Sequence, residues 1–236
     1  MEDHVTADLH IRHSNILKHS KRLDFMDDGE RKVVESGDQQ AIAKLRISRE
    51  STDRMNDNLV DQINVRVMSG DRLWILGDVL WAKEHEYART LAYYLGKIKC
   101  KNIVLIWGNH DPDIKHQRSV REEVSRQLRG ETYDKLTTRI QGQRVHLNHE
   151  AMAIWDGRHH GVWNLYGHSH AQAEKWLDEI MPGRWSMDVG VDYAKKILGE
   201  YRPFSFSEIK AIMAQRPGFG LLGSRNYHHK NETDEI

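Results

Sequence analysis

Short apolar runs, each followed by polar residues, recur along this chain. The clearest run spans residues 103–107, and it is followed by Gly108 and, after three polar residues, by Pro112. An apolar run of this length beside such breakers is typical of a buried strand. Similar runs predict further strands or strand-and-turn segments, at residues 4–7, 72–76, 145–148, 162–166 and 185–192.

Helical spacing appears in the segment that precedes residue 72. Met55, Leu59 and Ile63 fall on one face of a predicted helix, and we assign its N-cap to Ser51. Residues 18–50 are charged and weakly patterned, and they predict only short helical pieces. A helix with one apolar face is expected to cover the core and to carry no chemistry of its own.

A second amphipathic helix is predicted between the runs at 72–76 and 103–107. Its apolar residues recur at i, i+4, i+8 and i+11, and they are Tyr87, Leu91, Leu95 and Ile98. A strand, a helix and a strand at this spacing form a βαβ unit. The pattern therefore predicts an α/β fold.

Two more helices are predicted in the second half of the chain. Residues 113–142 are interpreted as a helical excursion, because Val120 and Val124 fall on one face. Ser205 and Glu208 have the spacing of a capping box ahead of an apolar stretch, which predicts the start of a helix.

The length suits one sizeable core, so we expect a single domain over residues 1–215. Residues 216–236 are polar and end in acids, which predicts a loosely ordered tail. Its histidine pair, His228 and His229, is not expected to bind metal. The charge is balanced, with 35 Lys and Arg residues and 35 Asp and Glu residues, so no global basic field attracts nucleic acid.

The sequence also bears on location. No stretch is long enough to cross a bilayer, and the acidic N-terminus has no secretory pattern. The single cysteine, Cys100, excludes an internal disulfide and fits a reducing cytoplasm. We therefore expect a cytoplasmic protein without a membrane partner, in which Cys100 is a packed core thiol.

The residues that follow the predicted strands are the types that bind hard or borderline metal ions. In an extended Asp-x-His segment, residues i and i+2 point to the same side and can reach one ion. Each motif alone also fits two solvated residues at a strand end. Together, five strand ends carry oxygen or nitrogen ligands without a thiolate, namely Asp8, His10, Asp78, Asn109, His110, His149, His168 and His170.

Seven candidate ligands, apart from His110, are too many for one ion in an ordinary site. They suit two ions that share one carboxylate, because neighbouring cations repel and need a bridging anion. The lone histidine among them has an alternative in His146. We choose His149 because it ends its apolar run, whereas His146 alternates within it.

Taken in order, the motifs resemble those of the calcineurin-like metallophosphoesterase superfamily. They are Asp-x-His, Gly-Asp, Gly-Asn-His-Asp, a lone His and Gly-His-x-His, and they run from Asp8 to about Asp192. The chain is most similar to small single-domain members of bacterial and phage type. Their opening motif continues with a His and an Asn-Ile pair, as His13, Asn15 and Ile16 do here.

The resemblance implies a four-layer sandwich, in which two mixed β-sheets pack face to face with flanking helices. It also implies a ligand set for two divalent ions. Asp8, His10 and His170 would hold the first ion, and Asp78 would bridge the two. The second ion would be held by Asn109, His149 and His168. Histidine, carboxylate and amide ligands suit Mn²⁺, our preferred ion, and also Fe²⁺, Zn²⁺, Co²⁺ or Ni²⁺.

The resemblance further implies roles in catalysis. A hydroxide that bridges the two ions would attack the phosphorus atom in line. His110 would stabilise the phosphoryl charge or protonate the leaving oxygen, and Asp111 would orient His110. Arg12 stands where similar proteins carry a glycine, so its guanidinium either clamps a phosphate or forms a surface ion pair. Arg12, His13 and Asn15 are therefore candidate substrate contacts.

We expect a dinuclear metal-dependent phosphohydrolase that cleaves phosphodiesters or phosphomonoesters, with diesters preferred by analogy with small members of the superfamily. The expected substrate is a small phosphorylated or nucleotide-like molecule. A nuclease is the first alternative, although the neutral net charge does not indicate a nucleic-acid partner. The second alternative is a non-catalytic scaffold that has lost its metals, and the presence of every expected ligand argues against it.

Overall fold

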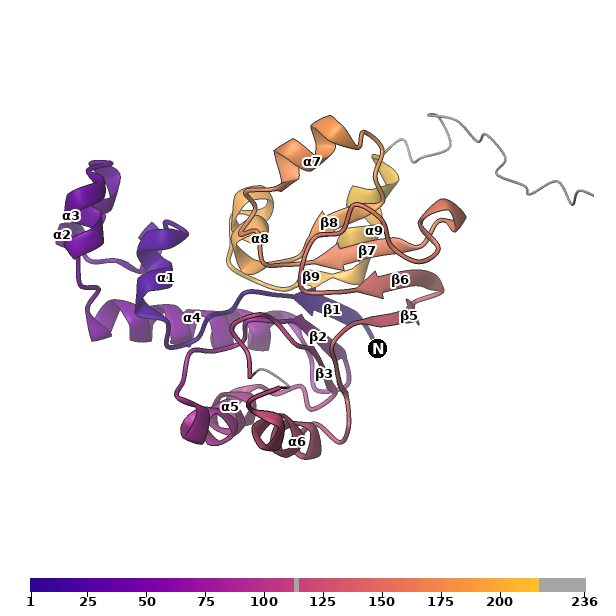
Figure 1. The fold of residues 1–236 in the computed structure, drawn as a ribbon, viewed down its shortest axis with the longest axis horizontal. Helices are drawn as coiled ribbons and strands as arrows, with labels where there is room; N and C mark the ends of the chain where they lie inside the picture. Colours follow the sequence, from indigo (N-terminus) through magenta and orange to yellow (C-terminus); the bar gives the residue numbers. More distant parts are fainter. Residues whose placement is uncertain (113–114, 217–236) are drawn as a thin grey trace, which may run out of the picture.

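Two β-sheets lie face to face between layers of helices (Figure 1) in the computed structural model, which describes residues 1–112 and 115–216. The strands of the first sheet are β1 (Asp3–Thr6), β2 (Arg72–Leu76), β3 (Ile103–Ile106), β4 (Thr132–Tyr133) and β9 (Phe204–Ser205). Those of the second sheet are β5 (Leu136–Ile140), β6 (Gln143–Leu147), β7 (Trp163–Tyr166) and β8 (Ser186–Asp188).

Both sheets are mixed. The first has the order β4-β3-β2-β1-β9, with β9 antiparallel to β1 and the other neighbours parallel. The second has the order β5-β6-β7-β8, with only β5 and β6 antiparallel. The predicted α/β sandwich with two mixed sheets is therefore confirmed.

The helices flank the sheets on both sides. Along the first sheet lie α4 (Arg49–Arg66), α5 (Glu84–Lys97) and α6 (Arg118–Gln127), and along the second lie α7 (Glu174–Ile180), α8 (Val191–Leu198) and α9 (Phe206–Ala214) (Figure 1). Helix α1 (Ser14–His19) ends at the start of the weakly patterned segment, which itself forms α2 (Asp28–Glu35) and α3 (Gln39–Lys44). Figure 1 shows α2 and α3 projecting from one end of the sandwich. The short helical pieces predicted there are confirmed.

Strand β2 illustrates why the sandwich has two hydrophobic cores. Side chains alternate along a strand, so successive residues face opposite sides of the sheet. Leu73 and Ile75 join the cluster beneath α4 and α5, whereas Trp74 and Leu76 join the cluster between the two sheets. All four residues are buried, so this strand reads as a continuous apolar run.

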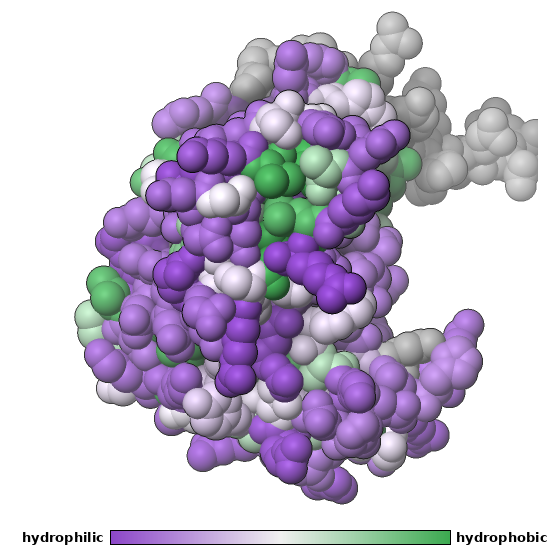
Figure 2. Space-filling view, turned by 90° about the vertical axis from the view of Figure 1, so that its left-hand side faces the viewer, coloured by the Kyte–Doolittle hydropathy of each residue, from purple (hydrophilic) through white to green (hydrophobic). Residues whose placement is uncertain are grey.

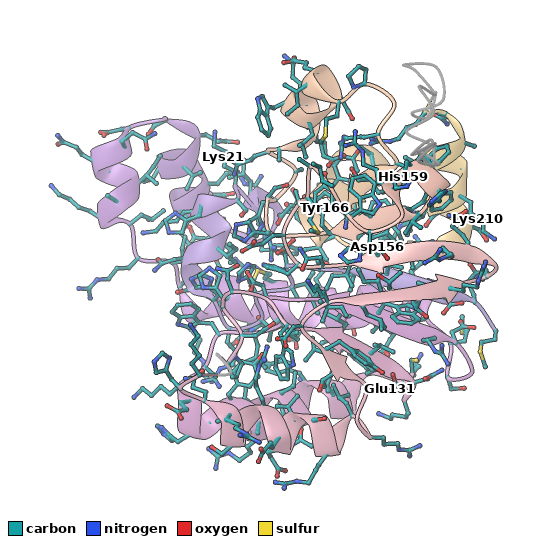
Figure 3. The ribbon with its side chains drawn as sticks, turned by 45° about the vertical axis from the view of Figure 1, so that its right-hand side comes forward. Lys21, Glu131, Asp156, His159, Tyr166 and Lys210 are labelled. Atoms are coloured by element: carbon teal, nitrogen blue, oxygen red, sulfur yellow. The ribbon has the colours of Figure 1, made fainter. Side chains whose placement is uncertain are left out.

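The outer face of the second sheet carries a buried ionic network. Figure 3 shows Tyr166 of β7 in the interior of the molecule. Its hydroxyl donates to Glu174 and accepts from Nη1 of Arg184 at 2.7 Å. Nη2 of Arg184 in turn lies 2.8 Å from Oε2 of Glu174. Because every charge there is paired, the network tolerates burial.

The N-cap assignment for α4 is wrong by three residues. The cap is Ser48, whose Oγ accepts the backbone N–H of Ser51 at 3.1 Å. The hydroxyl of Ser51 donates instead to Oε2 of Glu30 at 2.6 Å. A cap requires extended backbone, and Ser48 has it while Ser51 is already helical.

The predicted helical excursion over 113–142 is wrong beyond α6, because β4 and β5 follow that helix. Gln141 and Gly142, with φ values of 46° and 85°, form the two-residue turn between β5 and β6. This turn matches the twist of the paired strands and fixes their register. The segment at 185–192 also differs from the prediction, since the strand ends at Asp188 and α8 begins at Val191.

The predicted C-terminal tail and the predicted absence of a membrane span can be compared with the structure only within the described residues. The predicted tail lies outside them from residue 217 onwards, together with His228 and His229. Arg216, the first residue assigned to the tail, donates from Nη1 to Oδ1 of Asp178 at 3.0 Å and so belongs with the folded part. Among residues 1–112 and 115–216, no helix combines the length and the apolar character needed to cross a bilayer.

The capping box at the start of α9 is confirmed. Oγ of Ser205 accepts the N–H of Glu208 at 3.2 Å, and Oε2 of Glu208 accepts the N–H of Ser205 at 2.9 Å. Both carboxylate oxygens of Glu208 also accept from Arg202, at 2.7 and 2.9 Å. These bonds from Arg202 lower the pKa of Glu208 to about 2, although burial opposes them.

This shift makes a prediction about acid stability. A carboxyl whose pKa is lower in the folded state stabilises the protein above its unfolded pKa, and that contribution disappears as the pH falls through about 2. We expect Glu208→Gln to lower the free energy of unfolding by roughly 1 kcal/mol at pH 6. The difference from wild type should shrink by pH 3, as measured by urea denaturation.

Glu122→Gln is the matched control, because Glu122 forms an exposed pair with Arg118 on α6. Its effect should stay below about 0.5 kcal/mol at both pH values. An effect of Glu208→Gln that is equally large at pH 6 and pH 3 would contradict the prediction.

Candidate functional site

The predicted ligand residues meet where the strands of both sheets end. They follow β1, β2 and β3 of the first sheet and β6 and β7 of the second. Their ligand atoms form two groups, each with all atoms within 4.8 Å of one another. The groups are Asp8, His10 and His170, and Asp78, His149 and His168.

Asp78 belongs to the second group and also lies next to the first. Its Oδ2 is 3.4 Å from Nε2 of His10 in the first group and 3.4 Å from Nε2 of His149 in the second. The side chain of Asn109 completes the second group, because its Oδ1 is 2.9 Å from Nε2 of His149 and 2.8 Å from Nδ1 of His168. The structure thus brings all seven predicted ligand residues together, and the carboxylate of Asp78 lies near a histidine of each group.

The donor atoms fit divalent transition-metal ions. All of them are imidazole nitrogens or carboxylate and amide oxygens, which suit Mn²⁺, Fe²⁺ or Zn²⁺ better than a soft ion. Nε2 of His10 is buried and accepts or donates no hydrogen bond among the described residues. A buried polar atom without a partner costs free energy, and a cation at the centre of the group would satisfy it.

Backbone strain is concentrated in these residues. Five of them adopt the left-handed conformation that non-glycine residues rarely take, at a cost on the order of 1–3 kcal/mol each. The five, with their φ values, are Asp8 (58°), His10 (49°), Asp78 (52°), His168 (67°) and His170 (47°). Such strain in one place indicates a functional site, because packing alone does not require it.

Two glycines make room for the carboxylates. A Cβ at Gly108 would lie 2.3 Å from Oδ1 of Asp78, and a Cβ at Gly167 would lie 2.6 Å from Oδ2 of Asp8. Both distances are far below van der Waals contact. Any larger residue at either position would therefore displace a candidate ligand.

A buried network holds His170. Its Nδ1 lies 2.6 Å from Oδ2 of Asp192, which fixes the ring and leaves Nε2 for an ion. Asp192 also accepts two hydrogen bonds from Arg22, at 2.8 and 2.9 Å, and Arg22 donates to the backbone carbonyls of Asp8 and Leu9. Arg22 and Asp192 were not among the predicted site residues. Asp192 lies in the first turn of α8, and its place at the end of the segment predicted as a strand and turn was the only signal for it.

The charges of the cluster shift several pKa values. Burial, together with the negative charges of Asp188 and Asp78, raises the pKa of Asp8 to about 7, although His170 opposes the shift. Burial lowers the pKa of His149, but the hydrogen bond with Asp78 and the charge of Asp8 outweigh burial and raise it to about 9. Two buried carboxylates thus require positive charge beside them, which bound cations supply.

The contacts of Asp111 differ from those expected. Its Oδ2 accepts the N–H groups of Asp78 and Gly108, and its Oδ1 accepts from the N–H of Val79 and the hydroxyl of Tyr87, at 2.6 to 3.1 Å. Four donors occupy this carboxylate, and none of them is the His110 ring. Asp111 therefore ties together the loops after β2 and β3 and does not orient His110.

The ring of His110 lies at the open side of the site. It is exposed, and its centroid is 5.5 Å from those of His10 and Trp81. The ring of His13 stacks on Trp81 at 4.5 Å with an interplanar angle of 12°. Burial and the nearby His110 lower the pKa of His13 to about 4, so His13 is neutral at pH 7.

The remaining predicted residues lie apart from the two groups. Nδ1 of His146 bonds Thr137 on the neighbouring strand, which leaves His149 as the histidine of the site. Arg12 is exposed and donates from Nη1 to Oγ1 of Thr90 at 3.2 Å. Asn15 is exposed on α1.

Comparisons with known proteins agree with this geometry. The chain resembles the crystal structure of a protein of unknown function from Aquifex aeolicus, with a TM-score of 0.56, 17% sequence identity, and coverage of 89% of this chain and 98% of that one. At this identity the likeness shows the fold alone. No curated protein matches the sequence significantly. The sequence model of the calcineurin-like phosphoesterases matches residues 4–221, and the chain belongs to that family.

Proposed function

We propose that this chain is a dinuclear metal-dependent phosphohydrolase that prefers phosphodiesters. The observation that carries the proposal is the position of Asp78, whose Oδ2 is equally distant from a histidine of each group. A carboxylate placed in this way suits a bridge between two cations, which would otherwise repel one another. The family relationship supports phosphoester hydrolysis as the reaction.

The ligand assignment follows the two groups. Asp8, His10 and His170 would hold one ion, and His149, His168 and Asn109 the other. Two divalent ions would supply a hydroxide near neutral pH and polarise the phosphoryl oxygens. Mn²⁺ is our preferred ion, because the histidine, carboxylate and amide ligands suit it.

The protein's own side chains would handle the leaving group. His110 is not needed as a ligand, and its exposed ring stands beside His10, where it can protonate the leaving oxygen. Trp81 is 49% exposed and stacks on His13, so the two rings form an apolar wall next to His110. A diester carries a second organic group that a monoester lacks, and a wall of aromatic rings offers that group an apolar contact.

The direct test compares two chromogenic substrates. Metal-stripped protein titrated with Mn²⁺ should hydrolyse bis-p-nitrophenyl phosphate faster than p-nitrophenyl phosphate, and turnover should require the metal. Asp78→Ala should abolish both activities, because it removes the shared ligand. Asp61→Ala, on the exposed side of α4, is the matched control and should keep wild-type rates. Metal-independent turnover, or full activity in Asp78→Ala, would overturn the proposal.

The role of His110 gives a second prediction. His110→Asn should reduce kcat by about 10²- to 10⁴-fold for a diester whose leaving group is an unactivated alcohol. The loss should be smaller for bis-p-nitrophenyl phosphate, because its phenolate leaves without a proton. Bound metal, measured by elemental analysis, should not change. Equal losses on both substrates would show that His110 does not act as the acid.

The network behind His170 gives a third prediction. Asp192→Asn keeps the size of the side chain but removes the charge that holds His170 and pairs with Arg22. We expect metal affinity to fall by about 10- to 100-fold, as is typical when a partner of a ligand histidine is changed. Isothermal titration with Mn²⁺ measures it, and circular dichroism checks that the variant is folded. An unchanged affinity in a folded variant would contradict the assignment.

A further inference from the structure

An open groove lies between α4 and α5, outside the two ligand groups. It encloses about 1020 Å³ and begins at Arg12, which is two residues after His10 in the chain. Because the groove begins two residues from a proposed ligand, a molecule held by the proposed metal ions could extend towards it. Figure 2 shows the face of the molecule that carries the projecting helices, and hydrophilic residues cover most of it.

The charges in the groove favour an anion. Among the described residues, no carboxylate lies within ion-pair distance of Arg12 or Arg89, both of which line the groove. The other two cations of the lining are each paired with an aspartate, namely Arg49 with Asp53 at 3.4 Å and Lys97 with Asp57 at 3.7 Å. Two guanidinium groups therefore remain without a countercharge in one groove.

A buried amide in the wall adds a second, independent observation. Asn56 is only 2% exposed, and its Oδ1 accepts the backbone N–H of Arg12 at 2.8 Å, which fixes the amide. Its Nδ2 is buried and has no hydrogen-bond partner in the part of the chain that the structure describes. An unpaired buried donor is energetically unfavourable. The wall of the groove thus contains an unsatisfied donor together with the hydroxyl of Thr90, which also lines the groove and accepts from Arg12. The hydroxyl of Thr52, by contrast, already donates to the carbonyl of Ser48 at 2.9 Å.

We propose that this groove binds a second phosphate group of the substrate, and this inference rests on the proposed phosphohydrolase function. Guanidinium groups bind phosphate in bidentate fashion, and amide and hydroxyl donors complete its hydrogen bonds. The volume exceeds that of a single phosphate and leaves room for the group that links two of them. The substrate class is therefore a small molecule that carries at least two phosphates, such as a nucleotide.

The test measures binding to the full, metal-stripped chain by isothermal titration, so that the metal ions play no part. The probes are inorganic phosphate, pyrophosphate, AMP and ADP. We expect all four probes to bind, because the groove takes one phosphate group, and we expect pyrophosphate and ADP to bind more tightly than phosphate and AMP because they carry more negative charge. Equal binding of pyrophosphate and ADP would mean that the groove recognises phosphates alone, whereas tighter binding of ADP would add a contact to the nucleoside.

Arg89 is the residue to change, because it is exposed and lies outside the proposed catalytic groups. Arg89→Ala should weaken binding of the diphosphate probes by about tenfold or more, since charge-assisted hydrogen bonds are lost. Arg89→Lys should retain most of the affinity. Arg144→Ala, which removes an exposed arginine from the second sheet, should bind like wild type.

Separate arms distinguish failure of this inference from failure of the proposed function. Hydrolysis of bis-p-nitrophenyl phosphate by Mn²⁺-loaded protein should stay within twofold of wild type in Arg89→Ala, because that substrate has one phosphate. Wild-type affinity in Arg89→Ala, or no binding of any probe to the wild-type chain, would overturn the proposed phosphate site in the groove and would leave the proposed hydrolase function intact. If the Mn²⁺-loaded protein does not hydrolyse bis-p-nitrophenyl phosphate while the metal-stripped protein still binds the phosphate probes, the proposed hydrolase function is overturned instead.

Discussion

Two carboxylates buried side by side are the constraint on which the rest of the site depends. Asp8 and Asp78 are both buried at the ends of neighbouring strands, and the negative charge of Asp78 adds to the burial that raises the pKa of Asp8. Imidazole rings surround both of them, and His149 carries a raised pKa as a result. A pair of divalent cations would resolve this repulsion, which is why we interpret the cluster as a metal site. The strained backbone of the same residues has no other evident purpose.

The sandwich fold brings the residues of that cluster together. Strands from both sheets end at one place, so ligands from both halves of the chain can meet there. Asp111 joins the loops after β2 and β3 by accepting three backbone N–H groups, and it accepts a fourth hydrogen bond from Tyr87 of α5. Arg22 joins the loop after β1 to α8 through Asp192. These two residues hold the ligand loops without contributing ligands. The aromatic wall and the groove between α4 and α5 lie outside this rigid centre, where a substrate can select its contacts.

The cluster of candidate ligand residues was predictable because apolar runs end in residue types with metal-binding chemistry, and a βαβ spacing brings such ends to one edge of a sheet. The sequence could not show contacts between residues that are far apart in the chain. Arg22 and Asp192 are 170 positions apart, and no local pattern links them. Strands β4 and β5 were missed because their short, mixed segments depend on pairing with neighbouring strands. The expected role of Asp111 was wrong because strand ends can recruit a carboxylate for backbone bonds as readily as for an imidazole.

The most direct test of the central claim is crystallographic. Crystals soaked in Mn²⁺ and measured near the manganese absorption edge would locate bound ions by anomalous scattering. The account predicts two peaks roughly 3.5–4 Å apart, one beside His10 and His170 and the other beside His149 and His168, with the Asp78 carboxylate between them. A single peak, no peak, or peaks away from Asp78 would contradict the dinuclear site.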